Sequence, residues 1–151
     1  MFLKTVTVAF ILMAAASTFS QTMPPLEPGV SQKLAIWRAA NYSDVRYKLN
    51  LTIEKNAPTL KGTIEISVKS KANRIVLDWR KLKGHEALSK ISDVSKNGKP
   101  LILNLREPSA PVTRPAMYEY SREHLIFDEG VAIGENVIKL SSESPILTSG
   151  S

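Results

Sequence analysis

The chain has 151 residues and a net charge of +6, with 20 Lys and Arg against 14 Asp and Glu. Its hydrophobic fraction of 43% and charged fraction of 23% are typical of a globular domain and not of a disordered chain. Cysteine is absent, which excludes disulfides, thiol catalysis, thiolate zinc sites, iron–sulfur clusters and a lipoprotein anchor on these residues.

The first 20 residues have the layout of a targeting signal. Lys4 supplies a positive start, residues 5–16 are apolar and uncharged, and the small residues around Ser17 offer a cleavage site after Ser20. The apolar run is shorter than the roughly 20 residues that a membrane-spanning helix needs. We therefore expect residues 1–20 to be a Sec-type signal peptide of a periplasmic or extracellular protein without a membrane span.

The mature chain begins with a leader and a helix. Residues 21–30 contain three prolines and a glycine, which favours an extended leader. Residues 31–40 can form a short helix with Ser31 as its N-cap and with Leu34, Trp37 and Ala40 on one face. A packed arm without helical structure is the alternative for this segment.

Strand patterns follow for the rest of the chain. Residues 45–53 and 60–69 alternate apolar and polar side chains, which predicts two half-buried strands joined by the turn at 56–58 as an antiparallel hairpin. Further short strands are predicted in the following segments, the middle pair turning at Asn97-Gly98: 74–79, two within 91–105, 124–127 and 137–140. The prolines in 107–115 predict a loop or an edge.

Short alternating strands, many turns and one helical stretch predict an all-β fold. We expect residues 31–151 to form a single antiparallel β-sandwich domain with one short N-terminal helix.

Basic residues concentrate in the middle of the chain. Between Lys69 and Lys99, nine basic and three acidic residues give a local charge of +6. Such a stretch can bind an anionic polymer or a protein. It contains one aromatic residue, Trp79, so it lacks the stacking platform of a nucleic-acid site, and we expect no nucleic-acid partner.

The sequence predicts no catalytic or metal-binding group. His85-Glu86 begins like the zinc helix H-E-x-x-H, but Ser89 stands where the second histidine is needed. His124 lies near Asp128 and Glu129 without a third ligand type, so we expect a structural role; a hydrolase centred on His124 is the least favoured reading.

Other candidates have structural interpretations as well. The acidic pair Glu119 and Glu123 lacks an aromatic-lined cleft and is expected to be solvated. Trp37 and Trp79 could bind carbohydrate, but core or rim positions fit them better. Asn41 and Asn50 begin glycosylation sequons. We therefore predict no catalytic, cofactor-binding or metal-binding residue in this chain.

Four segments, in order, resemble one family. The runs at 29–49, 60–66 (L-K-G-T-I-E-I), 75–79 (I-V-L-D-W) and 133–140 (I-G-E-N-V-I-K-L) are similar to the N-terminal domain of aminopeptidase N-like zinc metallopeptidases, the gluzincins. The resemblance implies a saddle-shaped β-sandwich that packs on a thermolysin-like catalytic domain. That zinc-bearing domain is absent from these residues, which lack H-E-x-x-H. They also lack the G-x-M-E-N-type motif, of which residues 115–119 retain only Ala-Met.

Two functions follow as expectations. The first is a non-catalytic N-terminal domain of an exported aminopeptidase, which supports the catalytic domain, shapes access for the peptide N-terminus and is inactive alone. The alternative is a stand-alone secreted binding module that uses the basic face from Lys69 to Lys99 to hold a protein or an anionic polymer.

Overall fold

A computed structural model of the chain describes residues 22–104, 117–121 and 123–146. Its elements, in chain order, are α1 (Gln32–Asn41), β1 (Tyr42–Thr52), β2 (Thr59–Ser70), β3 (Ile75–Asp78), the 3₁₀ helix η1 (Glu86–Leu88), β4 (Lys90–Lys96), β5 (Lys99–Pro100), β6 (Ile102–Asn104), β7 (Met117–Ser121), β8 (His124–Phe127) and β9 (Gly134–Pro145). The expected signal peptide and the proline-rich segment 107–115 lie outside the described residues. No described helix has the length and apolarity needed to cross a membrane.

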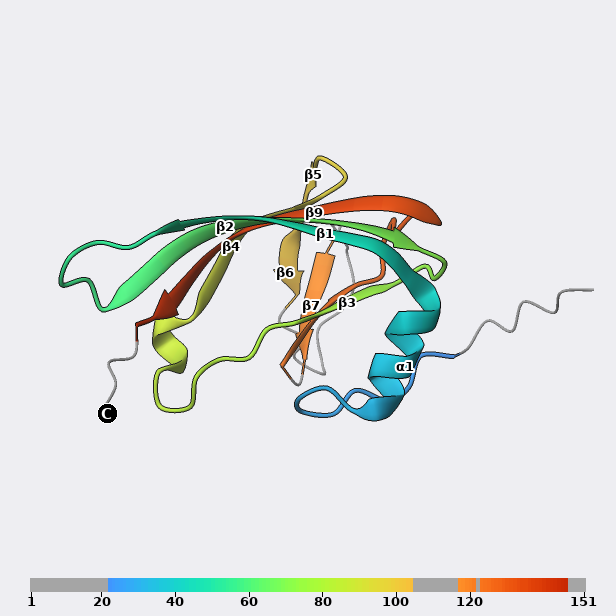
Figure 1. Cartoon of the computed structure of the whole chain (residues 1–151), viewed down its shortest axis with the longest axis horizontal. Coiled ribbons are helices and arrows are strands. Elements are labelled where there is room, and N and C mark those ends of the chain that lie inside the picture. Colours follow the sequence, from blue (N-terminus) through green and yellow to red (C-terminus); the bar gives the residue numbers. More distant parts are fainter. Residues whose placement is uncertain (1–21, 105–116, 122, 147–151) are drawn as a thin grey trace, which may run out of the picture.

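The strands form two sheets. Sheet A has the order β1-β2-β9-β4-β5 and sheet B the order β3-β8-β7-β6. Sheet A arches over sheet B and continues beyond it toward the turn between β1 and β2 (Figure 1). The predicted all-β fold with one short helix is confirmed. Among the described strands, every pair is antiparallel apart from β6 and β7, which pair in parallel, contrary to the expectation of an antiparallel sandwich.

The hairpin predicted from period-two alternation is present. β1 pairs antiparallel with β2, Tyr47 standing opposite Ile66 and Leu49 opposite Ile64. Asn56 takes a positive φ of 64° in the connecting turn. Since directly opposite residues share one face of a sheet, the apolar rows of β1 and β2 point to the same side, which is the side of sheet B.

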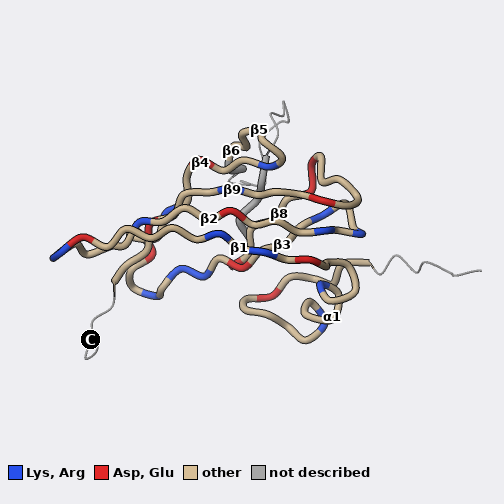
Figure 2. The backbone as a smooth tube through the Cα atoms, turned by 45° about the horizontal axis from the view of Figure 1, so that its top comes forward, with Lys and Arg blue, Asp and Glu red and all other residues tan. Residues whose placement is uncertain are grey.

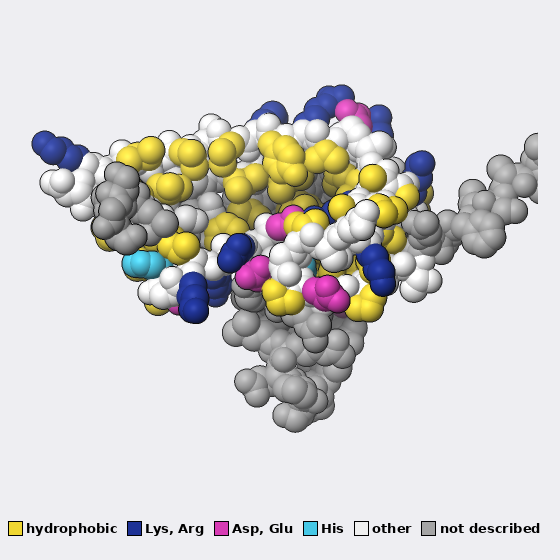
Figure 3. Space-filling model, turned by 60° about the horizontal axis from the view of Figure 1, so that its bottom comes forward, with side chains coloured by type: hydrophobic (Ala, Val, Ile, Leu, Met, Phe, Trp, Pro, Cys, Tyr) yellow, Lys and Arg dark blue, Asp and Glu magenta, His cyan; other side chains and the backbone are white. Residues whose placement is uncertain are grey.

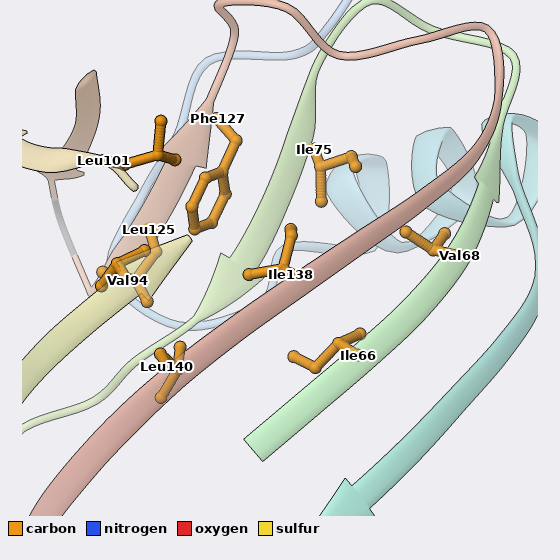
Figure 4. Close-up of a cluster of buried hydrophobic side chains, with 9 residues drawn as sticks. All are labelled: Ile66, Val68, Ile75, Val94, Leu101, Leu125, Phe127, Ile138 and Leu140. Carbon is orange, nitrogen blue, oxygen red and sulfur yellow. The ribbon is translucent and has the colours of Figure 1, made fainter. Parts of the chain in front are cut away.

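The main core lies between the sheets. Sheet A contributes side chains from β2, β4 and β9, and sheet B contributes β3 and β8 (Figure 4). Phe127, Ile75 and Ile138 have no exposed surface at its centre. β8 is buried along its whole length because it lies inside sheet B with both faces covered.

The second face of sheet B is covered by α1 and the leader. Ser31 caps α1, its Oγ accepting a hydrogen bond from Leu34 N at 3.2 Å. Leu34 and Trp37 are buried against Val76 as predicted, whereas Ala40 is exposed. The leader packs on the same cluster through Met23 and Leu26. It is therefore a docked segment of the domain.

The strand predictions differ from the structure at several points. Residues 90–104 form three strands, β4, β5 and β6, where two were predicted within 91–105. β9 runs from Gly134 to Pro145, well beyond the predicted 137–140, and β7 was not predicted. The end of β9 was missed because residues 141–144 are polar. Little else covers this part of the strand, so its sequence does not alternate between apolar and polar residues.

Two asparagines fasten the turn after β4. Asn97 and Gly98 both have positive φ, 50° and 77°, as a two-residue hairpin turn requires. Asn97 Oδ1 accepts from Val137 N at 2.8 Å, and Asn97 Nδ2 donates to Asn136 Oδ1 at 3.2 Å. Asn136, 1% exposed, also bonds the backbone of Ala132 and Gly134. The G-E-N segment, residues 134–136, thus helps to connect β4, β5 and β9 through hydrogen bonds.

Candidate functional site

The apolar face of β1 is exposed. The sequence predicts a half-buried strand, but five alternating side chains remain 44–71% exposed: Val45, Tyr47, Leu49, Leu51 and Ile53. The prediction of burial was wrong because alternation reports which face is apolar and not whether anything covers it. No described residue closes over this row, which we call the β1 apolar row.

A groove runs beneath the β1 apolar row. It lies between β1, an edge of sheet A, and β3, an edge of sheet B, so the sandwich is open on this side. Its volume is about 570 Å³, and its walls include Val45, Tyr47, Ile64, Ile75 and Leu77. A band of hydrophobic side chains and the hollow beside it are visible in the space-filling view (Figure 3).

The end of the groove is polar. Arg38 from α1 and Asp78 from β3 line it together. Arg38 Nε is buried and has no hydrogen-bond partner among the described residues. A ligand or protein segment in the groove would meet apolar walls and the Arg38–Asp78 ion pair.

A glycine makes room for the row farther along. A Cβ atom at Gly62 would lie 2.9 Å from Leu51 Cδ2 and 3.1 Å from the carbonyl oxygen of Asn50. Gly62 stands directly opposite Leu51 in the ladder. Leu51 consequently leans over β2 and keeps the apolar surface continuous where sheet A extends past sheet B.

The opposite face of sheet A is polar and solvated. Glu65 bonds Lys48 Nζ at 3.0 Å and Lys139 Nζ at 2.8 Å across three strands. These hydrogen bonds, that of Lys139 above all, lower the pKa of Glu65. The contrast between the two faces shows that the apolar row belongs to an inner surface.

His124 is a fully buried polar group with a partner at each ring nitrogen. Its Nδ1 lies 2.9 Å from Asp78 Oδ1 and its Nε2 lies 3.0 Å from the carbonyl oxygen of Glu27. A carboxylate oxygen and a backbone carbonyl oxygen therefore flank the two ring nitrogens. His124 thereby ties the leader to β3 and β8, which is the structural role expected of it.

Arg38 completes this network. Its guanidinium binds Asp78 with two hydrogen bonds of 2.8 and 2.6 Å. Burial would raise the pKa of Asp78, but the hydrogen bonds and charge of Arg38, with His124, outweigh it and leave the pKa below its usual value. No local pattern in the sequence indicates this pair, because the two residues are 40 positions apart.

The depressed pKa of Asp78 predicts an acid-dependent contribution to stability. A lowered carboxyl pKa stabilises the folded chain above the unfolded pKa of about 3.9, and the contribution is lost as pH falls through the folded pKa. Because 45% of the Asp78 side chain is exposed, we expect about 1 kcal/mol at most. Urea unfolding of wild type and Asp78→Asn at pH 7, 5, 4, 3 and 2 should show a gap that closes below pH 4. A gap that widens toward pH 2 would contradict this assignment.

The His85-Glu86 motif does not build a zinc helix. His85 and Glu86 are exposed, and the helical segment η1 comprises only residues 86–88. Glu86 accepts a hydrogen bond from the backbone of Gly84, and Ser89 is buried. Within the described ranges, no group of three or more His, Asp or Glu side chains could hold a metal ion.

The remaining candidates are dispersed. Glu123 accepts from Gly29 N at 2.9 Å and lies 3.6 Å from Arg80, while the side chain of Glu119 lies outside the description. Asp128 pairs with Arg74 at 3.4 Å. Trp37 is buried, and its ring lies nearly perpendicular to that of Tyr42, whose pKa burial raises to about 12.

Trp79 and the sequon asparagines, Asn41 and Asn50, are the last candidate residues. Trp79 is partly buried and packs on the main core, which leaves neither tryptophan as an open carbohydrate platform. Asn50 is exposed on β1, whereas Asn41 Nδ2 donates to Trp37 O at 2.8 Å. Glycosylation of either residue stays a prediction.

The basic stretch does not form one face. Along the backbone, Lys and Arg positions are interspersed with Asp and Glu positions (Figure 2). At least four of its nine basic residues pair with acids outside the stretch: Lys69 with Asp44 and Glu135, Arg74 with Asp128, Arg80 with Glu123, and Lys90 with Glu143. Lys96 is 5% exposed, and burial lowers its pKa against the opposing effect of Asp128 and Glu129.

Comparison with known proteins adds no relative. No protein-family model matches the chain, and no curated protein matches it. The candidate site is therefore defined by the β1 apolar row and its groove alone.

Proposed function

We propose that this chain is the non-catalytic N-terminal β-sandwich of an exported zinc aminopeptidase. It supports a thermolysin-like catalytic domain and shapes the access of the peptide N-terminus to it. The observation that carries the proposal is the exposed β1 apolar row on the inner side of sheet A. The four segments that resemble this family, in the family's order, support it from the sequence.

An exposed row of this kind is costly without a cover. Contiguous apolar patches above a few hundred Å² are rare on monomers and mark interaction surfaces. Tyr47, Leu49 and Leu51 are each more than half exposed and stand side by side on one strand. A domain docked against the open side of the sandwich would bury them, so we place the catalytic domain there.

The chemistry of the chain fits a supporting role. His124 is committed to backbone and carboxylate partners, and exposed His85 stands outside a helix. The zinc ion and its ligands would belong to the catalytic domain. Export by residues 1–20 is part of this proposal, because the parent enzyme would act outside the cytoplasm.

The docking surface can be tested by co-purification. The reading frame that follows Ser151 is expected to encode H-E-x-x-H, and the domain it encodes would be produced separately from the mature chain. Leu51→Lys places a charge in the row and should lower the amount of catalytic domain retained by about tenfold or more, since an unpaired charge would be buried. Ile36→Lys is the control, because Ile36 is 55% exposed on α1 and does not line the groove.

Hydrolytic activity is the second quantity that this experiment measures. The mature chain alone should not hydrolyse aminoacyl p-nitroanilides with added zinc. Turnover by the isolated chain, or equal retention of the catalytic domain by both lysine variants, would contradict the proposal. Salt-sensitive binding of an anionic polysaccharide, lost on reversing Lys81 and Lys83, would favour the alternative of a secreted binding module.

A further inference from the structure

We propose that the free edge of β1 pairs with β1 of a second copy of this chain. The two strands run antiparallel about a two-fold axis at Leu49, and two A sheets join into one. The inference does not depend on the proposed function, because it concerns the chain by itself.

The backbone of β1 is available for pairing. In the described part of the chain, β1 forms a ladder with β2 alone and ends sheet A. Residues 43–52 are all exposed, so the N–H and C=O groups on the free side face solvent. A long exposed edge is a template for another strand unless charges or bulges guard it.

Charged side chains and a bulge on this edge restrict which strands can pair with it. Arg46 and Lys48 stand on the polar face, and a bulge at Asp44, with φ of 53°, interrupts the ladder near the start of the strand. A strand that placed a basic residue opposite Arg46 or Lys48 would be repelled. Pairing is therefore confined to residues 46–52 and to partners that oppose these cations with neutral or acidic groups.

β1 itself meets this requirement in one register. With Leu49 opposite Leu49 of the second copy, Lys48 faces Asn50 and Arg46 faces Thr52 on the polar side. On the apolar side, Tyr47 faces Leu51. All seven residues from Arg46 to Thr52 then have a partner within the strand.

The neighbouring registers are less favourable. An axis at Tyr47 sets Arg46 against Lys48, and an axis at Lys48 sets two Lys48 side chains against each other. An axis at Asn50 avoids both repulsions but pairs only residues 48–52, five positions instead of seven. Charge pattern and ladder length together select Leu49.

The joined sheets would also cover apolar surface. Each β1 apolar row continues into the other, so Tyr47, Leu49 and Leu51 contact their counterparts instead of water. The contact is at the small end of specific interfaces, and we expect a dissociation constant on the order of micromolar. The dimer should therefore dissociate on dilution.

Sedimentation velocity of the mature chain from about 1 to 200 µM tests the association. We expect a concentration-dependent shift from monomer to dimer and at least a tenfold weaker dimer for Leu49→Lys, which sets two charges at the axis. Ile133→Lys is the matched control, since Ile133 is 69% exposed in the connection before β9, and it should dimerise like wild type. Far-UV circular dichroism verifies that both variants fold.

Two further variants report the register. Asn50→Glu brings a carboxylate opposite Lys48 twice in the Leu49 register and should tighten the dimer severalfold, whereas an axis at Asn50 would set two carboxylates together and weaken it. The chain contains no cysteine, so Leu49→Cys should form a disulfide-linked dimer on mild oxidation and Ile133→Cys should not.

A chain that stays monomeric at 200 µM overturns the inference. So does a dimer that Leu49→Lys leaves intact or that Asn50→Glu weakens. These outcomes are distinct from failure of the proposed function, which is read from retention of the catalytic domain. A chain that dimerises alone and retains no catalytic domain would support this inference and contradict the other.

Discussion

Replacing Phe127 by alanine is expected to lower the free energy of unfolding by about 4 kcal/mol. Phe127 has no exposed surface and packs between the two sheets with Ile75 and Ile138 (Figure 4). Its removal forfeits the transfer free energy of a phenyl ring and leaves a cavity that strands on both sides keep open.

Urea unfolding followed by tryptophan fluorescence measures this change. Ile133→Ala is the control, because Ile133 is 69% exposed, and it should alter stability by less than about 0.5 kcal/mol. A Phe127→Ala loss below about 2 kcal/mol would show that the space between the sheets collapses around the smaller side chain.

Replacing His124 by alanine should cost about 3 kcal/mol. The change removes a fully buried ring and its two contacts. It leaves the Glu27 carbonyl oxygen without its contact to the imidazole ring. Within this network, the only side chain that still binds Asp78 is then Arg38. The leader should then detach, which limited proteolysis within residues 22–30 would detect as faster cleavage.

The second histidine supplies the matched control. His85 is exposed in a loop, so His85→Ala should change neither stability by more than about 0.5 kcal/mol nor the rate of cleavage in the leader. Equal stability of the two alanine variants would mean that the His124 contacts are not maintained in solution. Rapid cleavage of the wild-type leader would contradict the docked arrangement.

Local patterns in the sequence predicted most of the fold. Alternation over 45–53 and 60–69 predicted the β1–β2 hairpin, Ser31 predicted the start of α1, and Asn97-Gly98 predicted the turn after β4. Each of these depends on neighbours in the chain, which a sequence displays directly. The class of fold followed from their number and spacing.

Features that depend on distant contacts could not be predicted. The Arg38–Asp78 pair and the capture of Glu27 by His124 join residues 40 and 97 positions apart. The parallel pairing of β6 with β7 likewise depends on how the chain returns to sheet B. Exposure of the β1 apolar row was missed for a related reason, since an alternating pattern describes a strand and not its surroundings.

The place of β9 in sheet A has a consequence for how the chain acquires its structure. β9 is the last of the described strands along the sequence, yet it lies between β2 and β4. Its partners in β2 are distant, with Ser70 opposite Gly134 and Thr59 opposite Pro145, 64 and 86 positions away. Pairings of such long range slow folding, because loop closure must precede the contacts that reward it. The larger sheet therefore cannot form cooperatively until synthesis has passed residue 145, and earlier stages of the nascent chain hold β2 and β4 without the strand that unites them.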